Sequence, residues 1–148
     1  MKSRLIVGSG FLGSALAENF SHSGDPTRVL SRSMSAVGDT EILSLTDRIV
    51  GDASDHRVIR DALEGIDEVF WCAGGRLPAE SESDVLGAIH DRCQPLLSAL
   101  EAINHTQQPP HLFLFSSGGT IYGDCSDETI TEDSATNPTT AYGIANLC

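Results

Sequence analysis

The sequence contains little positive charge, and none of it lies in the last third of the chain. Its 148 residues include 9 lysines and arginines against 21 aspartates and glutamates, which gives a formal net charge of −12 at pH 7. Lys2 is the sole lysine, and no lysine or arginine follows Arg92. A surface this acidic repels phosphate backbones, so the composition argues against nucleic-acid binding.

Paired cysteines, metal-ligand spacings and long apolar runs are also missing. The four cysteines form no CxxC pair, and the five histidines show no spacing typical of a metal site. We therefore expect no metal, and we interpret the cysteines as small apolar residues. No apolar run is long enough for a signal peptide or a membrane span, so we expect a cytoplasmic protein without membrane contact.

Strand-like and helix-like segments alternate along the chain. Apolar and β-branched runs predict strands at residues 4–9, 27–32, 47–52, 67–75 and 109–117, and residues 41–45 lead the chain back to the third of them. Helical periodicity predicts helices at residues 10–20, 54–65 and about 81–104, and a last helix starting at Ala141 after a loop over 118–140. The alternation predicts right-handed βαβ crossovers, and therefore a doubly wound parallel sheet of the Rossmann-like α/β class.

Local residues refine these boundaries. Ser54 is the expected N-cap of the second helix, and Gly24 and Gly65 are the expected stops of the first two helices. Pro95 should kink the long helix. The strand predicted at 109–117 is almost unbroken in apolar residues, which is typical of a central strand covered on both faces.

The segment GSGFLG, between the first strand and the first helix, fits the pattern GxGxxG. Gly8 allows a sharp turn off the strand, Gly10 leaves room for a pyrophosphate, and Gly13 allows close packing of helix on strand. Free N–H groups at the start of the helix favour phosphate. The pattern therefore predicts a dinucleotide site, to which Phe11 and Leu12 also contribute.

Ligands of doubly wound sheets lie beyond the carboxyl ends of the strands. We therefore expect further cofactor contacts at the ends of the other strands, from Asp52, Ala53, Cys72, Ala73, Gly74 and Ser116. Asp52 has two interpretations that the sequence leaves open. It accepts a hydrogen bond from the adenine amino group, or it caps the helix that follows.

The end of the second strand bears on the choice between NAD and NADP. An acidic residue there would bind the ribose hydroxyls of NAD, but residues 28–36 contain none. Arg32 stands there instead, and a guanidinium pairs well with a 2′-phosphate. The sequence therefore favours NADP(H) slightly, while a solvated surface arginine and NAD(H) remain open.

Two later motifs carry a family resemblance. FSSGGTIYG (residues 115–123) and NPTTAYGIAN (residues 137–146), following GFLG and VGDASD, resemble the NAD-dependent epimerase/dehydratase branch of the extended short-chain dehydrogenases/reductases. The resemblance covers essentially the whole chain, but only the front half of such a protein. It implies that residues 1–148 form an NAD(P)-binding Rossmann domain that is incomplete at its C-terminus, truncated before a substrate-binding lobe.

The resemblance also implies a mechanism. In the family, a tyrosinate removes a proton from a sugar hydroxyl while hydride moves to the nicotinamide, and a Ser or Thr hydroxyl orients that sugar hydroxyl. Tyr142 matches the family tyrosine, which also contacts the cofactor. The usual hydroxyl position falls on Gly118, and either Ser117 or Thr120 beside it could supply the group. The family's YxxxK lysine falls at Asn146, one helical turn after the tyrosine.

Asn146 is the main departure from the family pattern, because it still donates a hydrogen bond but carries no charge. A unit charge about 5 Å away at an effective dielectric of about 20 is worth roughly 3 kcal/mol. Without that charge, less tyrosinate is expected at neutral pH. A second departure is Arg92, which occupies a helix position where the superfamily often has a structural asparagine.

Three functions remain open from the sequence. The first is the cofactor-binding part of a sugar-nucleotide epimerase or dehydratase, with a nucleotide-sugar as partner if a C-terminal lobe exists. The second is a non-catalytic NAD(P)-binding protein that has lost the proton-transfer charge. The third is a short-chain reductase of another carbonyl. A homodimer is a further expectation that the sequence leaves open.

Overall fold

The computed structural model describes residues 1–33, 46–74, 78–124 and 129–148, which form two compact units. The first, here called the sheet unit, comprises residues 1–74 and 95–114. The second, here called the tyrosine unit, comprises residues 75–94 and 115–148. The segment 41–45, which precedes the predicted third strand, lies outside the described residues.

The sheet unit contains five parallel strands in the order β3-β2-β1-β4-β5. Its elements are β1 (Arg4–Val7), α1 (Phe11–Ser23), β2 (Thr27–Ser31), β3 (Asp47–Val50), α3 (His56–Ala62), β4 (Glu68–Trp71), the second half of α5 (Val85–Asn104) and β5 (His111–Leu114). In the register, Ile6 of β1 lies between Val29 of β2 and Phe70 of β4. The strand order reverses between β1 and β4. The carboxyl end of β1 therefore lies at the switch point of the sheet, where ligands of this fold bind.

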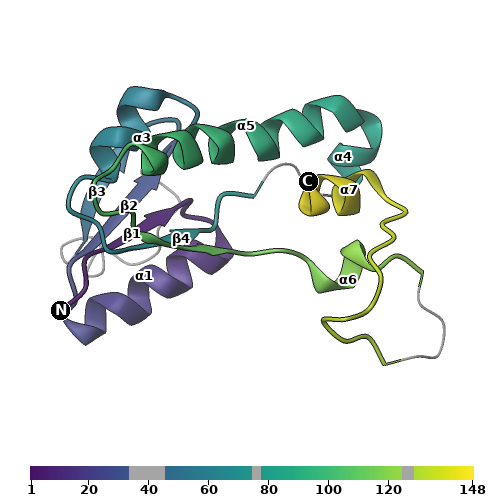
Figure 1. Ribbon diagram of the computed structural model, residues 1–148, viewed down its shortest axis with the longest axis horizontal. Helices are drawn as coiled ribbons and strands as arrows, with labels where there is room; N and C mark the ends of the chain where they lie inside the picture. Colours follow the sequence, from purple (N-terminus) through teal and green to yellow (C-terminus); the bar gives the residue numbers. More distant parts are fainter. Residues whose placement is uncertain (34–45, 75–77, 125–128) are drawn as a thin grey trace. The chain divides into compact units, whose positions relative to one another are not determined.

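Apolar side chains cover both faces of this sheet, as the predicted fold requires. On one face Ile6, Ala17 and Val29 form a small core with side chains of α1. On the other face Leu5, Leu30, Ile59, Val69, Trp71, Ala99 and Ile103 belong to a larger core made with α3 and α5. Figure 1 shows α1 on one side of the strands and α3 on the other. The doubly wound α/β prediction is confirmed.

The prediction that the fifth strand is covered on both faces is wrong for the described residues. β5 pairs there with β4 alone, and Leu114 is 53% exposed. Phe113 stacks on Phe70 of β4 with the ring centroids 4.6 Å apart, yet it remains partly exposed. An apolar run identifies a strand, but its burial depends on the elements that flank it.

Two helix boundaries also differ from prediction. The segment predicted as one helix at 81–104 is two helices, α4 (Pro78–Ser83) and α5. The break falls at Asp84, whose carboxylate accepts a hydrogen bond from the Gly87 N–H at 3.1 Å and so caps the start of α5. Pro95 lies within α5. Gly24 ends α1 as predicted.

The N-cap of α3 is Asp55 rather than Ser54. The Asp55 carboxylate accepts a hydrogen bond from the Arg57 N–H at 2.8 Å. Ser54 instead donates both its N–H and its hydroxyl to Asp52 Oδ1, at 2.9 and 2.7 Å. The helix ends at Ala62, three residues before the predicted stop at Gly65. Three closely spaced candidate caps, Asp52, Ser54 and Asp55, made the boundary ambiguous in sequence.

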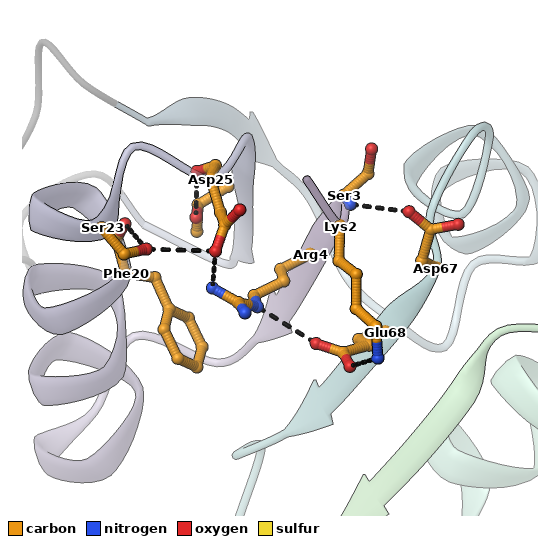
Figure 2. Close-up of polar contacts among 9 residues, drawn as sticks. Lys2, Ser3, Arg4, Phe20, Ser23, Asp25, Asp67 and Glu68 are labelled. Atoms are coloured by element: carbon orange, nitrogen blue, oxygen red, sulfur yellow. Dashed lines mark hydrogen bonds and ion pairs between the residues drawn. The ribbon is translucent and has the colours of Figure 1, made fainter.

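Ionic side chains tie the amino ends of the central strands together (Figure 2). Glu68 of β4 accepts hydrogen bonds from Lys2 and, at 3.1 Å, from Arg4 of β1. Arg4 also pairs with Asp25 at 2.7 Å and lies 4.3 Å from the centre of the Phe20 ring. These contacts lie at the amino ends of the strands, whereas ligands of such sheets bind at the carboxyl ends.

The tyrosine unit contains α4, the first half of α5, and two further helices. These are α6 (Gly118–Ile121) and α7 (Ala141–Leu147). The short helix α6 falls in the segment predicted to be loop. Two glycines at its start gave no helical signal, and the Asn137 N–H bonds to its Ile121 carbonyl at 3.0 Å. Tertiary contacts, rather than propensity, therefore account for this turn of helix.

Candidate functional site

The three glycines of the turn after β1 meet three different environments. Gly8 has φ +99°, and a Cβ there would lie 2.8 Å from the Ala73 N atom. A Cβ on Gly13 would lie 2.0 Å from the Gly8 carbonyl oxygen. A Cβ on Gly10 would meet no atom of the described residues within 4 Å. The protein itself therefore requires glycine at 8 and 13, but leaves open space beside Gly10.

This open space adjoins the start of α1. Gly10 is the N-cap, and no side chain caps the helix. Phe11 is 95% exposed and Leu12 is 38% exposed, so neither side chain is buried over the turn. The geometry fits the diphosphate of a dinucleotide, which needs unobstructed backbone, free N–H groups and the positive end of a helix dipole.

The end of β2 brings Ser31, Arg32 and Asp52 into one neighbourhood. The buried Ser31 hydroxyl donates to the Ser33 carbonyl oxygen at 2.8 Å, which shapes the turn that carries the exposed Arg32. The hydrogen bonds from the Ser54 N–H and hydroxyl hold the pKa of Asp52 below its usual range, with a smaller contribution from the charge of Arg32. Of the two interpretations of Asp52, capping of the following helix is wrong, because the N-cap of α3 is Asp55. Asp52 instead holds the turn before α3, and both bonds from Ser54 use the same carboxylate oxygen.

The predicted contacts at the end of β4 and after β3 have distinct roles in packing. Cys72 packs against the core on the α1 face, and burial raises the pKa of its thiol to about 11. A thiol with so high a pKa is a poor nucleophile. We therefore interpret Cys72 as an apolar packing residue. Ala73 backbone atoms abut Gly8, and Gly74 is exposed with open space around its Cα. The Ala53 side chain is buried in the larger core.

Tyr142 lies in the first turn of α7 and is half-buried. The Thr140 hydroxyl caps this helix by accepting a hydrogen bond from the Gly143 N–H at 3.0 Å. Glu82 of α4 accepts from the Ala141 N–H at 2.8 Å. Sequence reasoning missed Glu82, because the contact spans 59 positions and no local pattern marks it.

Asn146 is folded back along α7. Its Nδ2 donates to the Tyr142 carbonyl oxygen at 2.8 Å, and the Asn146 carbonyl accepts from the Ser116 hydroxyl at 3.2 Å. The predicted residues Ser116, Tyr142 and Asn146 therefore belong to one hydrogen-bonded group. In this conformation one amide hydrogen of Asn146 is used by a carbonyl oxygen of its own helix.

The two candidate hydroxyls, those of Ser117 and Thr120, lie on or beside α6, which packs against α7. The Thr120 hydroxyl donates to the Ser117 carbonyl oxygen at 3.3 Å. A Cβ on Gly143 would lie 2.7 Å from the Thr120 carbonyl oxygen, so the backbones of α6 and α7 approach closely beside Tyr142. The structure thus brings Ser117 and Thr120 to the tyrosine helix, and it does not choose between them.

The described residues contain neither a metal-binding cluster nor a membrane-spanning helix. No group of three or more histidine, cysteine or acidic side chains is placed to hold a metal ion in the described part of the chain. Within the same residues, no helix is both long and apolar enough to span a bilayer.

A model of the NAD-dependent epimerase/dehydratase family matches residues 5–148. The chain belongs to this family. Among curated relatives, it is 29% identical to a UDP-glucose 4-epimerase of Corynebacterium glutamicum, over 99% of this chain and 44% of that protein. The family resemblance predicted from the motifs is therefore confirmed.

Solved structures give the same result for the fold. A UDP-glucose 4-epimerase of Brucella ovis in complex with NAD superposes with a TM-score of 0.85 and 26% identity, covering 99% of this chain and 45% of that one. A further UDP-glucose 4-epimerase structure gives the same TM-score and identity over 98% of this chain. The chain therefore spans less than half the length of these family members, and the part it matches is their Rossmann-like N-terminal domain.

Proposed function

We propose that the chain binds a nicotinamide dinucleotide and forms the cofactor-binding part of a sugar-nucleotide epimerase or dehydratase. The observation that carries this proposal is the open space at Gly10, set between two glycines that the fold itself requires. No described residue crowds position 10 and so requires a glycine there, whereas a diphosphate against the start of α1 would require one. The NAD complex of the Brucella relative supports the same assignment.

The residues of each unit would have separate tasks. The turn at Gly8, Gly10 and Gly13 would hold the diphosphate through backbone N–H groups. A bound nicotinamide supplies a site that accepts and returns hydride. Tyr142 would move the proton of the substrate hydroxyl, and the hydroxyl of Ser117 or Thr120 would orient that group.

A single substitution tests the cofactor site. Gly10→Val places a branched side chain in the open space, so we expect at least a tenfold weaker affinity for NADH, because the diphosphate can no longer approach the backbone. The extended backbone at Gly10, with φ −72° and ψ −164°, accepts valine without strain. Affinity is measured by fluorescence titration of the full chain with NADH and NADPH.

The matched control is Ala15→Val, which adds similar bulk at an exposed position of the same helix. It should bind like the unmodified chain, and both variants should keep the unmodified melting temperature. Equal affinity in Gly10→Val, or no saturable binding by the unmodified chain, would remove the proposal.

We further propose that Arg32 favours NADP(H) over NAD(H). It is exposed at the end of β2, where the ribose of a dinucleotide would lie, and the nearby Asp52 carboxylate is already held by Ser54. Arg32→Ala should weaken NADPH binding about tenfold and leave NADH binding nearly unchanged. Arg57→Ala, an exposed arginine on α3, is the control. Equal effects of Arg32→Ala on the two cofactors would contradict the preference.

One observation favours a second function, a dinucleotide-binding protein without catalysis. The side chain in the family's lysine position bonds to its own helix through Nδ2 and carries no charge. A chain of this kind would bind the cofactor yet fail to oxidise a sugar nucleotide. Binding of NADH together with no cofactor reduction by UDP-glucose or UDP-galactose would favour this alternative.

A further inference from the structure

Two cysteines of the tyrosine unit lie close together although they are far apart in sequence. Cys93 is half-buried in the first half of α5, and Cys148 is the exposed C-cap of α7. Both are free thiols, and Cys148 lies close enough to Cys93 to affect the ionisation of its thiol. The proposed cofactor and catalytic roles use neither residue.

Independent hydrogen bonds bring the first half of α5 and the end of α7 together. Arg92, adjacent to Cys93, donates through Nη2 to the Phe115 carbonyl oxygen at 2.9 Å. The next residue, Ser116, donates its hydroxyl to the Asn146 carbonyl oxygen at 3.2 Å. The chain of contacts therefore runs from α5 through the segment after β5 to the last turn of α7, beside Cys148.

The two thiols differ in their surroundings. Burial raises the pKa of the Cys93 thiol, the neighbouring Cys148 raises it further, and the charge of Arg92 acts in the opposite direction. Cys148 is open to solvent. Cys148 is thus the thiol that a dissolved oxidant reaches first, and Cys93 is the protected thiol positioned beside it.

We propose that Cys93 and Cys148 form a reversible disulfide that ties the end of the tyrosine helix to α5. The bond would close a loop containing Ser116, Ser117, Thr120 and Tyr142, which are the candidate catalytic residues of this unit. Because it links two positions distant in sequence, it would restrict the unfolded chain and hold α7 in place. The site is a modification site, and it stands whether or not the chain binds a dinucleotide.

The oxidant we assign is a small-molecule disulfide such as glutathione disulfide. The Cys148 thiolate attacks one sulfur of the oxidant, and one glutathione thiolate leaves as the mixed disulfide forms. The Cys93 thiolate then attacks the Cys148 sulfur and displaces the second glutathione. Two cysteine thiols are oxidised and one disulfide is reduced to two thiols, with two protons passing to solvent or to the leaving thiolates.

Thiol counting on the full chain tests the proposal. The sequence has four cysteines, and we expect treatment with glutathione disulfide to leave two titratable thiols and a monomer lighter by two hydrogen atoms. Peptide mapping should find Cys93 joined to Cys148, and dithiothreitol should restore all four thiols. The rate of ring closure should increase with pH, because the resolving thiol must ionise.

Matched variants separate this pair from the other cysteines. Cys125→Ser should still form the internal disulfide, whereas Cys93→Ser should stop at a glutathione adduct on Cys148. Cys148→Ser should be oxidised at least tenfold more slowly at Cys93. Trp71 fluorescence checks that each variant is folded, because this side chain is only 2% exposed. Four remaining thiols after treatment, a lasting adduct on the unmodified chain, or a bond through Cys72 or Cys125 would overturn the proposal.

Discussion

Asn146 shows how one side chain separates this protein from the motif of its family. Its amide bonds to the carbonyl of Tyr142, one turn earlier, rather than presenting a cation. A lysine there would have placed a positive charge close to the phenol, and a charge at about 5 Å is worth roughly 3 kcal/mol before screening. Under the proposed function, the change would therefore affect proton transfer more than the fold.

Restoring the charge should alter the ionisation of one tyrosine. The chain has two tyrosines, and in Asn146→Lys we expect tyrosinate absorbance to appear at lower pH than in the unmodified chain, because the added ammonium stabilises a nearby phenolate. The measurement is tyrosinate absorbance against pH. Asn146→Gln, which stays neutral, is the control. The same shift in both variants, or its persistence after Tyr142→Phe, would contradict the electrostatic account.

At the level of single residues, the sequence predicted positions better than contacts. The tasks of the glycines at 8 and 13 follow from local geometry, and the structure agrees with both, whereas the task of Gly10 stays a prediction. Asp52 was ambiguous because a carboxylate at a strand end suits both a ligand and a turn. The contact of Glu82 with α7 had no local signature, since it depends on how α4 packs.

At the level of elements, α7 depends on two acceptors at its start. Its seven residues are too few to be stable alone, so capping by Thr140 and Glu82 and packing against α6 and α4 must hold it. The caps orient the first turn, where Tyr142 lies. The position of the proposed base is thus set by two side chains that lie outside the helix.

Removing one cap should loosen this helix selectively. Thr140→Ala deletes the bond to the Gly143 N–H and should cost about 1 kcal/mol of local stability. Amide hydrogen exchange in residues 143–147 should then be about fivefold faster, while exchange in β1 stays unchanged. Thr139→Ala, at the neighbouring exposed threonine, is the control. Equal acceleration by both variants would show that the cap is not what stabilises α7.

Elements with a strong pattern could be predicted, and those made by context could not. The alternation of apolar runs predicted β1, β2, β4 and β5 with the helices between them. The break at Asp84 could have been found, because an aspartate before an apolar helical pattern is a typical N-cap. Helix α6 could not, because its glycines disfavour helix and its contacts come from residues near position 137.

At the level of the whole chain, two of the nine lysines and arginines pair with one largely buried carboxylate. Lys2 and Arg4 both pair with Glu68, whose side chain is only 10% exposed, and they hold the amino ends of β1 and β4 together (Figure 2). The pKa of Glu68 lies below its usual range, chiefly because of the hydrogen bond from Lys2. Arg4 lowers this pKa further, whereas burial acts in the opposite direction. The ionised form is therefore the one that stabilises the sheet.

This arrangement predicts how stability depends on pH. Because the pKa of Glu68 is lower in the folded chain, its contribution is complete above the unfolded value of about 4.3 and is lost as the pH falls through the lower folded value. Glu68→Gln should destabilise the sheet unit by about 1–2 kcal/mol at pH 7 and by much less near pH 3. Denaturant unfolding followed by Trp71 fluorescence measures both values.

Glu64→Gln, at an exposed carboxylate in the turn after α3, is the control for the loss of one negative charge. It should change stability little at either pH. A constant cost of Glu68→Gln from neutral to acid pH would mean that shape, rather than charge, accounts for its effect.

The three environments of the glycine turn also set how this segment can vary during evolution. Positions 8 and 13 are constrained by the backbone itself, so every folded descendant must keep them whatever it binds. Position 10 meets no atom of the described residues, so under the proposed function only the dinucleotide constrains it. In lineages that abandoned the dinucleotide, larger residues should accumulate at position 10 first, while its two neighbours in the motif stay invariant.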